Sequence, residues 1–516
     1  MRRLRCPSQF WLIAAGAAAI SGLVVSASAE AEKAPITPSN SAFSYAWWNP
    51  GSGAAIPASA DYVGPLGKVG LLNTAGPVVT KGHPFFEPIG ANGRACVTCH
   101  QPANGMSLAV DTVQERWRVT GGKDPIFAAV DGANCPSAPQ GDAASHSLLL
   151  KHGLFRIFLP WPAKNADGSN LAPEFDIEVV SDPTGCNLDP VYGLKSANPT
   201  ISVFRRPRVV ANMKYVASGG DQPFNIKDGS AMDRDPETGR FVNMNIMADA
   251  REPTQKTQAV NAALTHLQSK SKPTEAQLKQ ILDFENQLYV AQTWSAKAGN
   301  LTEKGGPSAL GPQALNRETP GLGDNFATPV FGYFDQWTKP RSGDAQAEFR
   351  ASVARGMEVF FTRPFYIRDV THLNTVGLGN PIKRTCATCH NAKMTGMDFA
   401  PGWMDLGTGN LPWANTLDAT AELPLFKLTC KAGKAHPYLG KVVYSHDPGR
   451  ALISGRCADI GAITMQQFRG LAARAPYFSN GSAKDLGALV DFYDKRFEAG
   501  YTEVEKRDLV NFLSVL

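Results

Sequence analysis

The pentapeptide CVTCH at residues 96–100 has a counterpart, CATCH, at residues 386–390. Two thiols at this spacing can each add to a vinyl group of one porphyrin, and the adjacent histidine can then coordinate the porphyrin iron. The two motifs therefore predict two covalently bound haem c groups. A redox-active pair of thiols or a zinc site is the alternative. Haem attachment falls on Cys96, Cys99, Cys386 and Cys389, and iron coordination falls on His100 and His390.

The first 29 residues have the features of a secretory signal peptide. Three arginines precede the apolar run Trp11–Val25, and small residues follow it at a site that suits cleavage. An uncleaved membrane anchor is the alternative, but the run is shorter than the ~20 residues that a spanning helix needs. We therefore expect export to the periplasm, with no stable membrane insertion after the signal is cleaved. The formal net charge of +5 includes those arginines, and no basic stripe predicts binding to nucleic acid.

The nine cysteines support export. Cys6 leaves with the signal peptide, four cysteines belong to the two motifs, and the remainder falls as one pair in each half of the chain. In an oxidising compartment an even remainder is most simply explained by two disulfides. The proposed pairs are Cys135–Cys186 and Cys430–Cys457, although the number of cysteines alone does not fix the pairing. Buried free thiols are the alternative.

The two halves resemble an imperfect internal repeat. A basic residue, a glycine and two phenylalanines precede each motif, within residues 81–86 and 355–361. Each half ends in a capping box followed by an apolar stripe at helical spacing, at residues 274–288 and 502–516. An entry helix, the motif and a terminal helix packed on the entry helix are the plan of a cytochrome c domain. We therefore predict a mainly α fold with two tandem cytochrome c-type domains and long irregular insertions.

The domain boundaries follow from composition. Residues 300–325 are rich in glycine and proline and lack periodicity, which is typical of a connection. Residues 344–361 have helical spacing and should lead into the second motif. The predicted organisation is a signal peptide at 1–29, an N-terminal domain with an insertion at 30–299, a connection at 300–340 and a C-terminal domain at 341–516.

The second axial position of each iron decides whether a haem only transfers electrons or also binds a small oxidant. For the first haem, His266 is a candidate ligand or distal acid–base group, and an ordinary structural histidine is the alternative. For the second haem, Tyr493 and Met465 are candidate ligands, and a packing role for Tyr493 is the alternative. Met106 and Met397 follow the proximal histidines too closely in the sequence to reach the far face of either haem, so we expect them in the core. We expect His436 and His446 at the surface. Arg469 and Arg474 are candidates to pair with haem propionates.

Several segments resemble the bacterial di-haem cytochrome c peroxidase superfamily, which includes the MauG group. The resemblance is carried by the tandem motifs, by FRGLAARAPYFSNGS at residues 468–482 and by LVDFYD at 489–494. It implies that the haem of His100 reacts with peroxide and that the haem of His390 relays electrons from a small periplasmic donor, a cytochrome c or a cupredoxin. By register it also implies Tyr493 as the second ligand of the relay haem and Gln258 as a polar group near the reactive haem.

The sequence departs from that family pattern at three positions. Ala248 replaces the tryptophan between the haems, Ser479 replaces a histidine, and Gln268 stands where a catalytic glutamate is usual. The expected function is therefore a divergent enzyme that reduces hydrogen peroxide or a related oxidant, with His266 and Gln258 as its distal catalytic residues. Two alternatives stay open: an electron carrier with both irons six-coordinate, and MauG-like oxidation of a partner protein.

Overall fold

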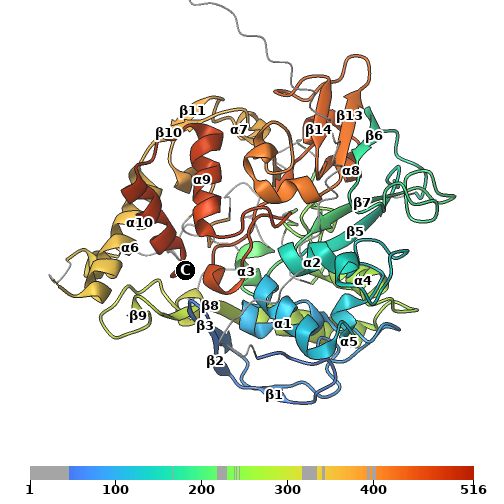
Figure 1. Ribbon diagram of the computed structural model, residues 1–516. Helices are drawn as coiled ribbons and strands as arrows, with labels where there is room; N and C mark the ends of the chain where they lie inside the picture. The colour runs from blue at the N-terminus through green and yellow to red at the C-terminus, as the bar shows by residue number, and fades with distance from the viewer. Residues whose placement is uncertain are drawn as a thin grey trace, which may run out of the picture. The chain divides into compact units, whose positions relative to one another are not determined.

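Helices and small antiparallel sheets alternate along the chain, and neither dominates (Figure 1). The computed structural model describes residues 46–165, 167–217, 229, 231–237, 239, 241–242, 244–316, 334–339, 343–391, 395–397 and 402–516. The predicted signal peptide and part of the predicted connection lie outside these residues. Helix accounts for 31% and strand for 19%, so the fold is mixed α/β and the prediction of a mainly α protein is wrong.

The elements have the following bounds. The helices are α1 Val110–Thr120, α2 Ser147–His152, α3 Met213–Val216, α4 Gln255–Thr265, α5 Glu275–Gln287, α6 Ala345–Thr362, α7 Thr371–Thr375, α8 Ala451–Ser454, α9 Leu486–Phe497 and α10 Glu503–Leu513. The strands are β1 Ala55–Ile56, β2 Ser59–Gly64, β3 Gly67–Asn73, β4 Val78–Val79, β5 Phe155–Pro160, β6 Phe175–Ser181, β7 Thr200–Arg205, β8 Leu288–Ser295, β9 Gly299–Asn300, β10 Phe365–Ile367, β11 Ile382–Arg384, β12 Trp403–Met404, β13 Leu425–Cys430, β14 Val442–Ser445 and β15 Ile463–Thr464.

A four-stranded antiparallel sheet, in the order β2-β3-β8-β9, supports the first half. Strand β8 follows helix α5 without a loop, because Leu288 ends the helical apolar stripe and also begins an extended run rich in apolar and aromatic residues. Such residues favour strands when they can pack on a sheet face. Val69 and Leu71 of β3 and Val290 of β8 are buried in the same core as α5. The sheet was missed because its strands are short and the helical spacing of α5 runs directly into β8.

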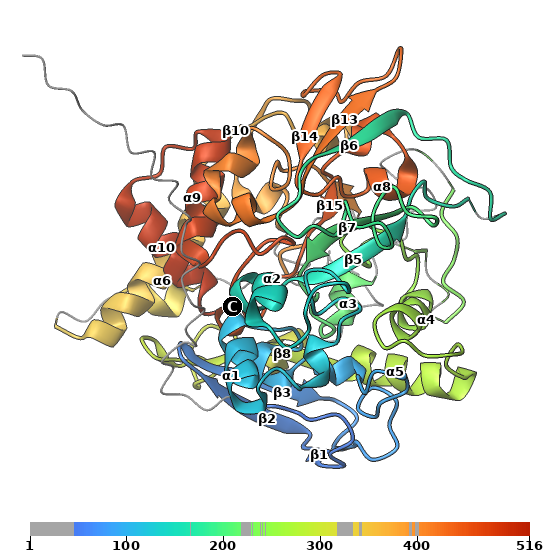
Figure 2. The same ribbon diagram turned by 45° about the vertical axis from the view of Figure 1, so that its right-hand side comes forward.

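A second sheet joins the two halves of the sequence. Strand β13 pairs antiparallel with β14 on one side and with β6 on the other, although β6 lies about 250 residues earlier. Figures 1 and 2 show β6 beside β13 from both directions. Phe175, Phe426 and Leu428 form a buried cluster on this sheet. The boundaries at 300–340 and 341–516 stay a prediction.

The predicted terminal helices are confirmed, but the entry helix is present only in the second half. Thr274 and Thr502 cap α5 and α10, and each accepts a hydrogen bond from the backbone three residues on, as the capping boxes predict. Helix α6 agrees with the predicted helix at 344–361. Before the first motif, residues 80–95 form turns instead, because Gly82 and Pro84 oppose a helix there.

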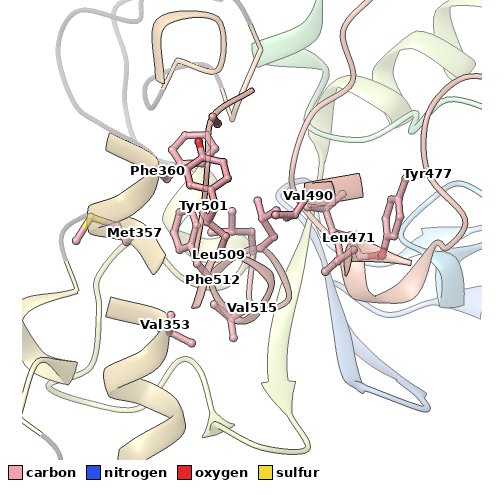
Figure 3. Close-up of a cluster of buried hydrophobic side chains, with 14 of the residues drawn as sticks. Val353, Met357, Phe360, Leu471, Tyr477, Val490, Tyr501, Leu509, Phe512 and Val515 are labelled. Carbon is pink, nitrogen blue, oxygen red and sulfur yellow. The ribbon is translucent and has the colours of Figure 1, made fainter. Parts of the chain in front are cut away.

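Helices α6 and α10 pack closely in the second half. Figure 3 shows Val353, Met357 and Phe360 of α6 facing Leu509 and Phe512 of α10, in a buried hydrophobic cluster. The closest approach is at Gly356, where an added Cβ would lie 1.9 Å from the carbonyl oxygen of Asp508. Glycine is therefore required here to let the two backbones approach.

Replacing Gly356 with alanine should lower the free energy of unfolding by about 1–3 kcal/mol, the usual cost of overpacking a close contact. The midpoint of urea denaturation of the haem-loaded protein measures this. Gly141→Ala is the matched control, because an added Cβ at that position meets no atom within 4 Å. Equal midpoints for the two variants would contradict the close-contact argument.

Both predicted disulfides are confirmed. Cys135 and Cys186 have Cα atoms 5.1 Å apart, and Cys430 and Cys457 have Cα atoms 6.2 Å apart. Both values lie in the range of normal disulfides. Because such bonds persist in oxidising compartments, they indicate an extracytoplasmic protein. Among the residues described, no helix combines the length and apolar character needed to cross a bilayer.

Candidate functional site

Both motifs fold in the same local way. Each Cys-x-x-Cys segment forms one short 3-10 turn, Cys96–Thr98 or Cys386–Thr388, and the four cysteines are not disulfide-bonded. The Nδ1 atom of His100 lies 3.3 Å from the carbonyl oxygen of Met106, and that of His390 lies 2.9 Å from the carbonyl oxygen of Gly396. A proton placed on Nδ1 leaves Nε2 for iron, as is usual for ligating histidines.

The residues around the motifs do not suit a zinc site. Within the part of the chain that the structure describes, no group of three or more histidine, cysteine or acidic side chains is arranged to hold a metal ion. A structural zinc site needs four such ligands. Two reduced thiols and one histidine beside an apolar cavity instead fit covalent haem.

A cavity of about 1250 Å³, open solvent included, adjoins the first motif. Cys96, Cys99 and His100 lie on its wall, and most of the remaining wall is apolar, which suits the flat apolar face of a porphyrin. Burial lowers the pKa of His100 to about 4, so the imidazole is neutral at ordinary pH. The neutral imidazole is the form that binds a metal.

The sequence candidates His266 and Gln258 both line this cavity. They lie on one face of helix α4 and its C-terminal cap, with Ala262 between them at four-residue spacing. The Nδ1 atom of His266 lies 2.5 Å from Oδ2 of Asp131, so its Nε2 is the nitrogen available toward the cavity.

Asp131 holds His266 in this orientation. The carboxylate is buried and also forms an ion pair with Arg94. Burial acts to raise the pKa of Asp131, but Arg94 and His266 outweigh burial, and the net pKa lies below its usual range. An ionised carboxylate that orients a histidine at a cavity is the arrangement of a general acid–base pair. Sequence analysis missed Asp131 and Arg94, which lie far from His266 in the chain.

Glu285 is a further polar residue that sequence analysis missed. It lies on α5, is 4% exposed, lines the His100 cavity and accepts a 3.3 Å hydrogen bond from Gln255. Burial raises the pKa of Glu285 to about 7. The sequence held a signal: Glu285 continues the apolar stripe of Leu278, Ile281 and Leu282, where a carboxylate is unusual.

Glu285 predicts a pH-dependent stability. Because its folded pKa is raised, the folded protein holds the proton more tightly than the unfolded chain, so its contribution falls as pH rises from about 4.5 to about 7. At one pKa unit per 1.36 kcal/mol, the loss is roughly 3 kcal/mol above pH 7. Glu285→Gln should remove this slope in urea denaturation of the haem-loaded protein. Glu358→Gln, an exposed control, should keep the slope, and a slope retained in Glu285→Gln would disprove the assignment.

The three positions that depart from the peroxidase pattern are not equivalent. Ala248 lines the His100 cavity, and Ser479 lines a cavity beside His390. Gln268 is exposed, has a left-handed backbone with φ 53°, and is not among the residues that line the His100 cavity. The position where a catalytic glutamate was expected therefore lies away from this site.

The cavity beside the second motif is apolar, with a volume of about 680 Å³, open solvent included. The rings of His390 and Tyr493 lie 6.1 Å apart and nearly perpendicular, and the ring of Phe468 lies 4.5 Å from that of His390. Burial raises the pKa of Tyr493, which keeps the phenol neutral in these surroundings. Tyr493 lines both cavities that adjoin His390, whereas Met465 lines one of them, so both candidates are near this histidine.

The remaining methionines and histidines named from the sequence are all buried. Met106 and Met397 are buried in hydrophobic clusters, as expected because each follows its proximal histidine by only a few residues in the sequence. The prediction that His436 and His446 lie at the surface is wrong, since both are buried. The Nε2 atom of His436 lies 3.2 Å from Oδ2 of Asp405, and Nδ1 of His446 lies 3.0 Å from the carbonyl oxygen of Pro424.

Comparisons with known proteins do not reveal a family. No family model matches the chain, and no curated protein matches it. A solved structure of hydrazine synthase from Kuenenia stuttgartiensis, studied under xenon pressure, aligns at 13% identity with a TM-score of 0.28, covering 61% of this chain and 73% of its own. That similarity is too low to carry an argument.

The resemblance to the di-haem cytochrome c peroxidase superfamily is therefore wrong as an assignment of family. It rested on short segments such as residues 468–482, and neither a family model nor a curated protein matches the chain. The turns at residues 80–95 and the antiparallel sheets also differ from the tandem, mainly α domains that the motifs and helical spacing predicted.

Proposed function

We propose that this protein is a periplasmic di-haem c-type oxidoreductase that reduces hydrogen peroxide or a related small oxidant at the His100 site. Electrons would come from a small redox protein, such as a cytochrome c or a cupredoxin, and enter at the His390 site. One observation carries the proposal. The His100 cavity contains titratable polar groups, whereas the cavity beside the second motif, which Cys386, Cys389 and His390 line, is almost wholly apolar.

The polar groups of the His100 cavity suit a reaction that consumes protons. Reduction of hydrogen peroxide to two water molecules takes up two electrons and two protons. The bound haem would supply the redox chemistry at iron. His266 can accept a proton from the bound oxidant and return it to the departing oxygen, while Asp131 holds the ring and balances its charge.

Two other side chains support this role. Gln258 lies on the same helical face as His266, so its amide can orient a small polar molecule in the cavity. Glu285, with a pKa of about 7, can supply a second proton near neutral pH. The family resemblance suggested Gln258, and its place on the cavity wall supports it separately, whereas Glu285 follows from the cavity wall alone.

The His390 cavity suits electron transfer. Apolar walls exclude water and small polar oxidants, and Tyr493 lines the cavity with its ring 6.1 Å from that of His390. A second protein ligand such as Tyr493 or Met465 would close the site to substrate, and axial-ligand identity is a main determinant of potential.

Spectroscopy of the haem-loaded protein tests the proposal. We expect one high-spin ferric haem that reacts with peroxide, one low-spin haem, and peroxide-dependent oxidation of a reduced small cytochrome c. Two low-spin haems that do not react with peroxide would support the alternative of a pure electron carrier, with His266 itself coordinating the first iron.

A further inference from the structure

Three arginines lie on the walls of two neighbouring cavities, the His100 cavity and the more polar of the two cavities that adjoin His390. Arg206 and Arg208 line the His100 cavity, and Arg206 and Arg474 line the cavity that contains His390, Met465 and Tyr493. Arg206 therefore borders both sites. The Nη2 atom of Arg206 donates a 2.8 Å hydrogen bond to the carbonyl oxygen of Arg474, which ties the two arginines together across 268 residues of sequence.

These arginines contact no carboxylate among the residues that the structure describes. Arg206 also donates to the carbonyl oxygen of His152 at 3.1 Å, and Arg208 donates to that of Thr464 at 3.2 Å. Arg474 bonds to two neighbouring glutamines, and its buried Nε has no partner. Burial lowers the pKa of Arg206 to about 9 and that of Arg474 to about 10, and Arg474 itself adds to the decrease for Arg206.

The neighbouring acids are already neutralised. Asp249 pairs with Arg205 and Arg251, and Asp447 pairs with Arg205, so two arginines and two aspartates cancel there. Buried cations without a counter-ion are costly, and burying them normally requires a bound anion. The arrangement therefore points to an anionic ligand with more than one negative group.

The lack of charged residues among those described around the apolar His390 cavity indicates which anion the arginines bind. Each haem carries two propionate carboxylates, yet no residue described on the wall of that cavity is charged. Arg206 and Arg474 line the adjoining cavity, whose wall also includes His390 and Tyr493. Guanidinium groups bind carboxylates strongly, often through two parallel hydrogen bonds.

We propose that Arg206, Arg208 and Arg474 form one carboxylate-binding cluster that holds propionates of both haems, with Arg206 shared between the two. The inference rests on the two covalent haems of the proposed function, but it does not depend on the substrate. A shared cation favours the electron-rich reduced state of both haems, because the added electron lies near a positive charge. Arg206 thereby couples the two potentials.

Redox titration of the haem-loaded protein tests this coupling. Arg206→Gln should lower the midpoint potentials of both haems, Arg208→Gln mainly that of the His100 haem, and Arg474→Gln mainly that of the His390 haem. We expect about a tenfold change in each affected reduction equilibrium, which is ~59 mV for one electron. Arg206→Lys keeps the charge and should restore much of both potentials, and Arg118→Gln, an exposed control on α1, should change neither.

The outcomes separate the inference from the proposed function. A pyridine haemochrome spectrum first counts the haems, and one haem or none in the unaltered protein would overturn both. Two haems without peroxide turnover would reject the proposed function alone, since the potentials remain measurable. Arg206→Gln with both potentials unchanged, or only one changed, would overturn the shared cluster. A second result would also overturn it. If the haem-loaded protein binds nitrite or inorganic phosphate, and Arg206→Gln abolishes that binding but leaves both potentials unchanged, the ligand of the cluster is a free oxyanion.

Discussion

Replacing Cys96 and Cys99 together with alanine should leave one covalent haem per chain, the one attached beside His390. The reverse double replacement, at Cys386 and Cys389, should leave only the haem beside His100. The proposed function gives each motif its own covalent haem, because the two motifs line separate cavities. The intact mass of the chain and its pyridine haemochrome absorbance measure the loss of one of the two haems.

The disulfide cysteines provide the matched control. Cys135→Ser combined with Cys186→Ser removes the same number of sulfur atoms from the same half of the chain, but it should leave both haems attached. Retention of two covalent haems after loss of Cys96 and Cys99 would show that these thiols do not bind a porphyrin. The proposed function would then lose its cofactor at the His100 site.

His266→Ala should lower kcat/KM for peroxide by about 10²–10⁴-fold, the usual contribution of a positioned acid–base group. Asp131→Asn should also lower the rate, since the neutral amide no longer stabilises a charged imidazole. Single-turnover stopped-flow measurements with peroxide report this step directly. Haem content is measured in parallel, because Asp131 also binds Arg94 and its loss affects stability.

Gln268→Ala is the control for this prediction. The peroxidase resemblance would give position 268 a catalytic role, whereas the structure leaves Gln268 exposed and outside the wall of the His100 cavity. We expect no change in rate from this variant. A large loss of activity in Gln268→Ala together with full activity in His266→Ala would contradict this assignment. Proton transfer would then be placed at Gln268, just after the end of helix α4.

Local patterns predicted local structure well. The capping boxes at Thr274 and Thr502 predicted the starts of α5 and α10, because a cap satisfies backbone groups within four residues. The two disulfides followed from the number of cysteines and from their place in the two halves. The same kind of argument failed for the first entry helix, where the repeat at residues 81–86 is not accompanied by helix-forming residues.

Sheet pairing was not predictable from the chain. Strand β13 pairs with β6 although about 250 residues separate them, and short strands of this kind carry little periodicity of their own. Long-range pairing depends on packing between segments, so the mixed α/β architecture emerged only from the fold. The two terminal helices do not represent the short strands between them, which is why the prediction of a mainly α fold is wrong.

The sequence by itself determined the chemistry that fits within a few residues. Two thiols and a histidine in five consecutive positions predict haem attachment, and the turn at each motif directs Nδ1 of the histidine to a carbonyl six residues later. Only the tertiary structure decided what surrounds those motifs. Asp131 reaches His266 across 135 residues, and Arg206 reaches Arg474 across 268 residues. Such groups meet because burial brings distant segments together, and no local pattern encodes which buried charges will share a cavity.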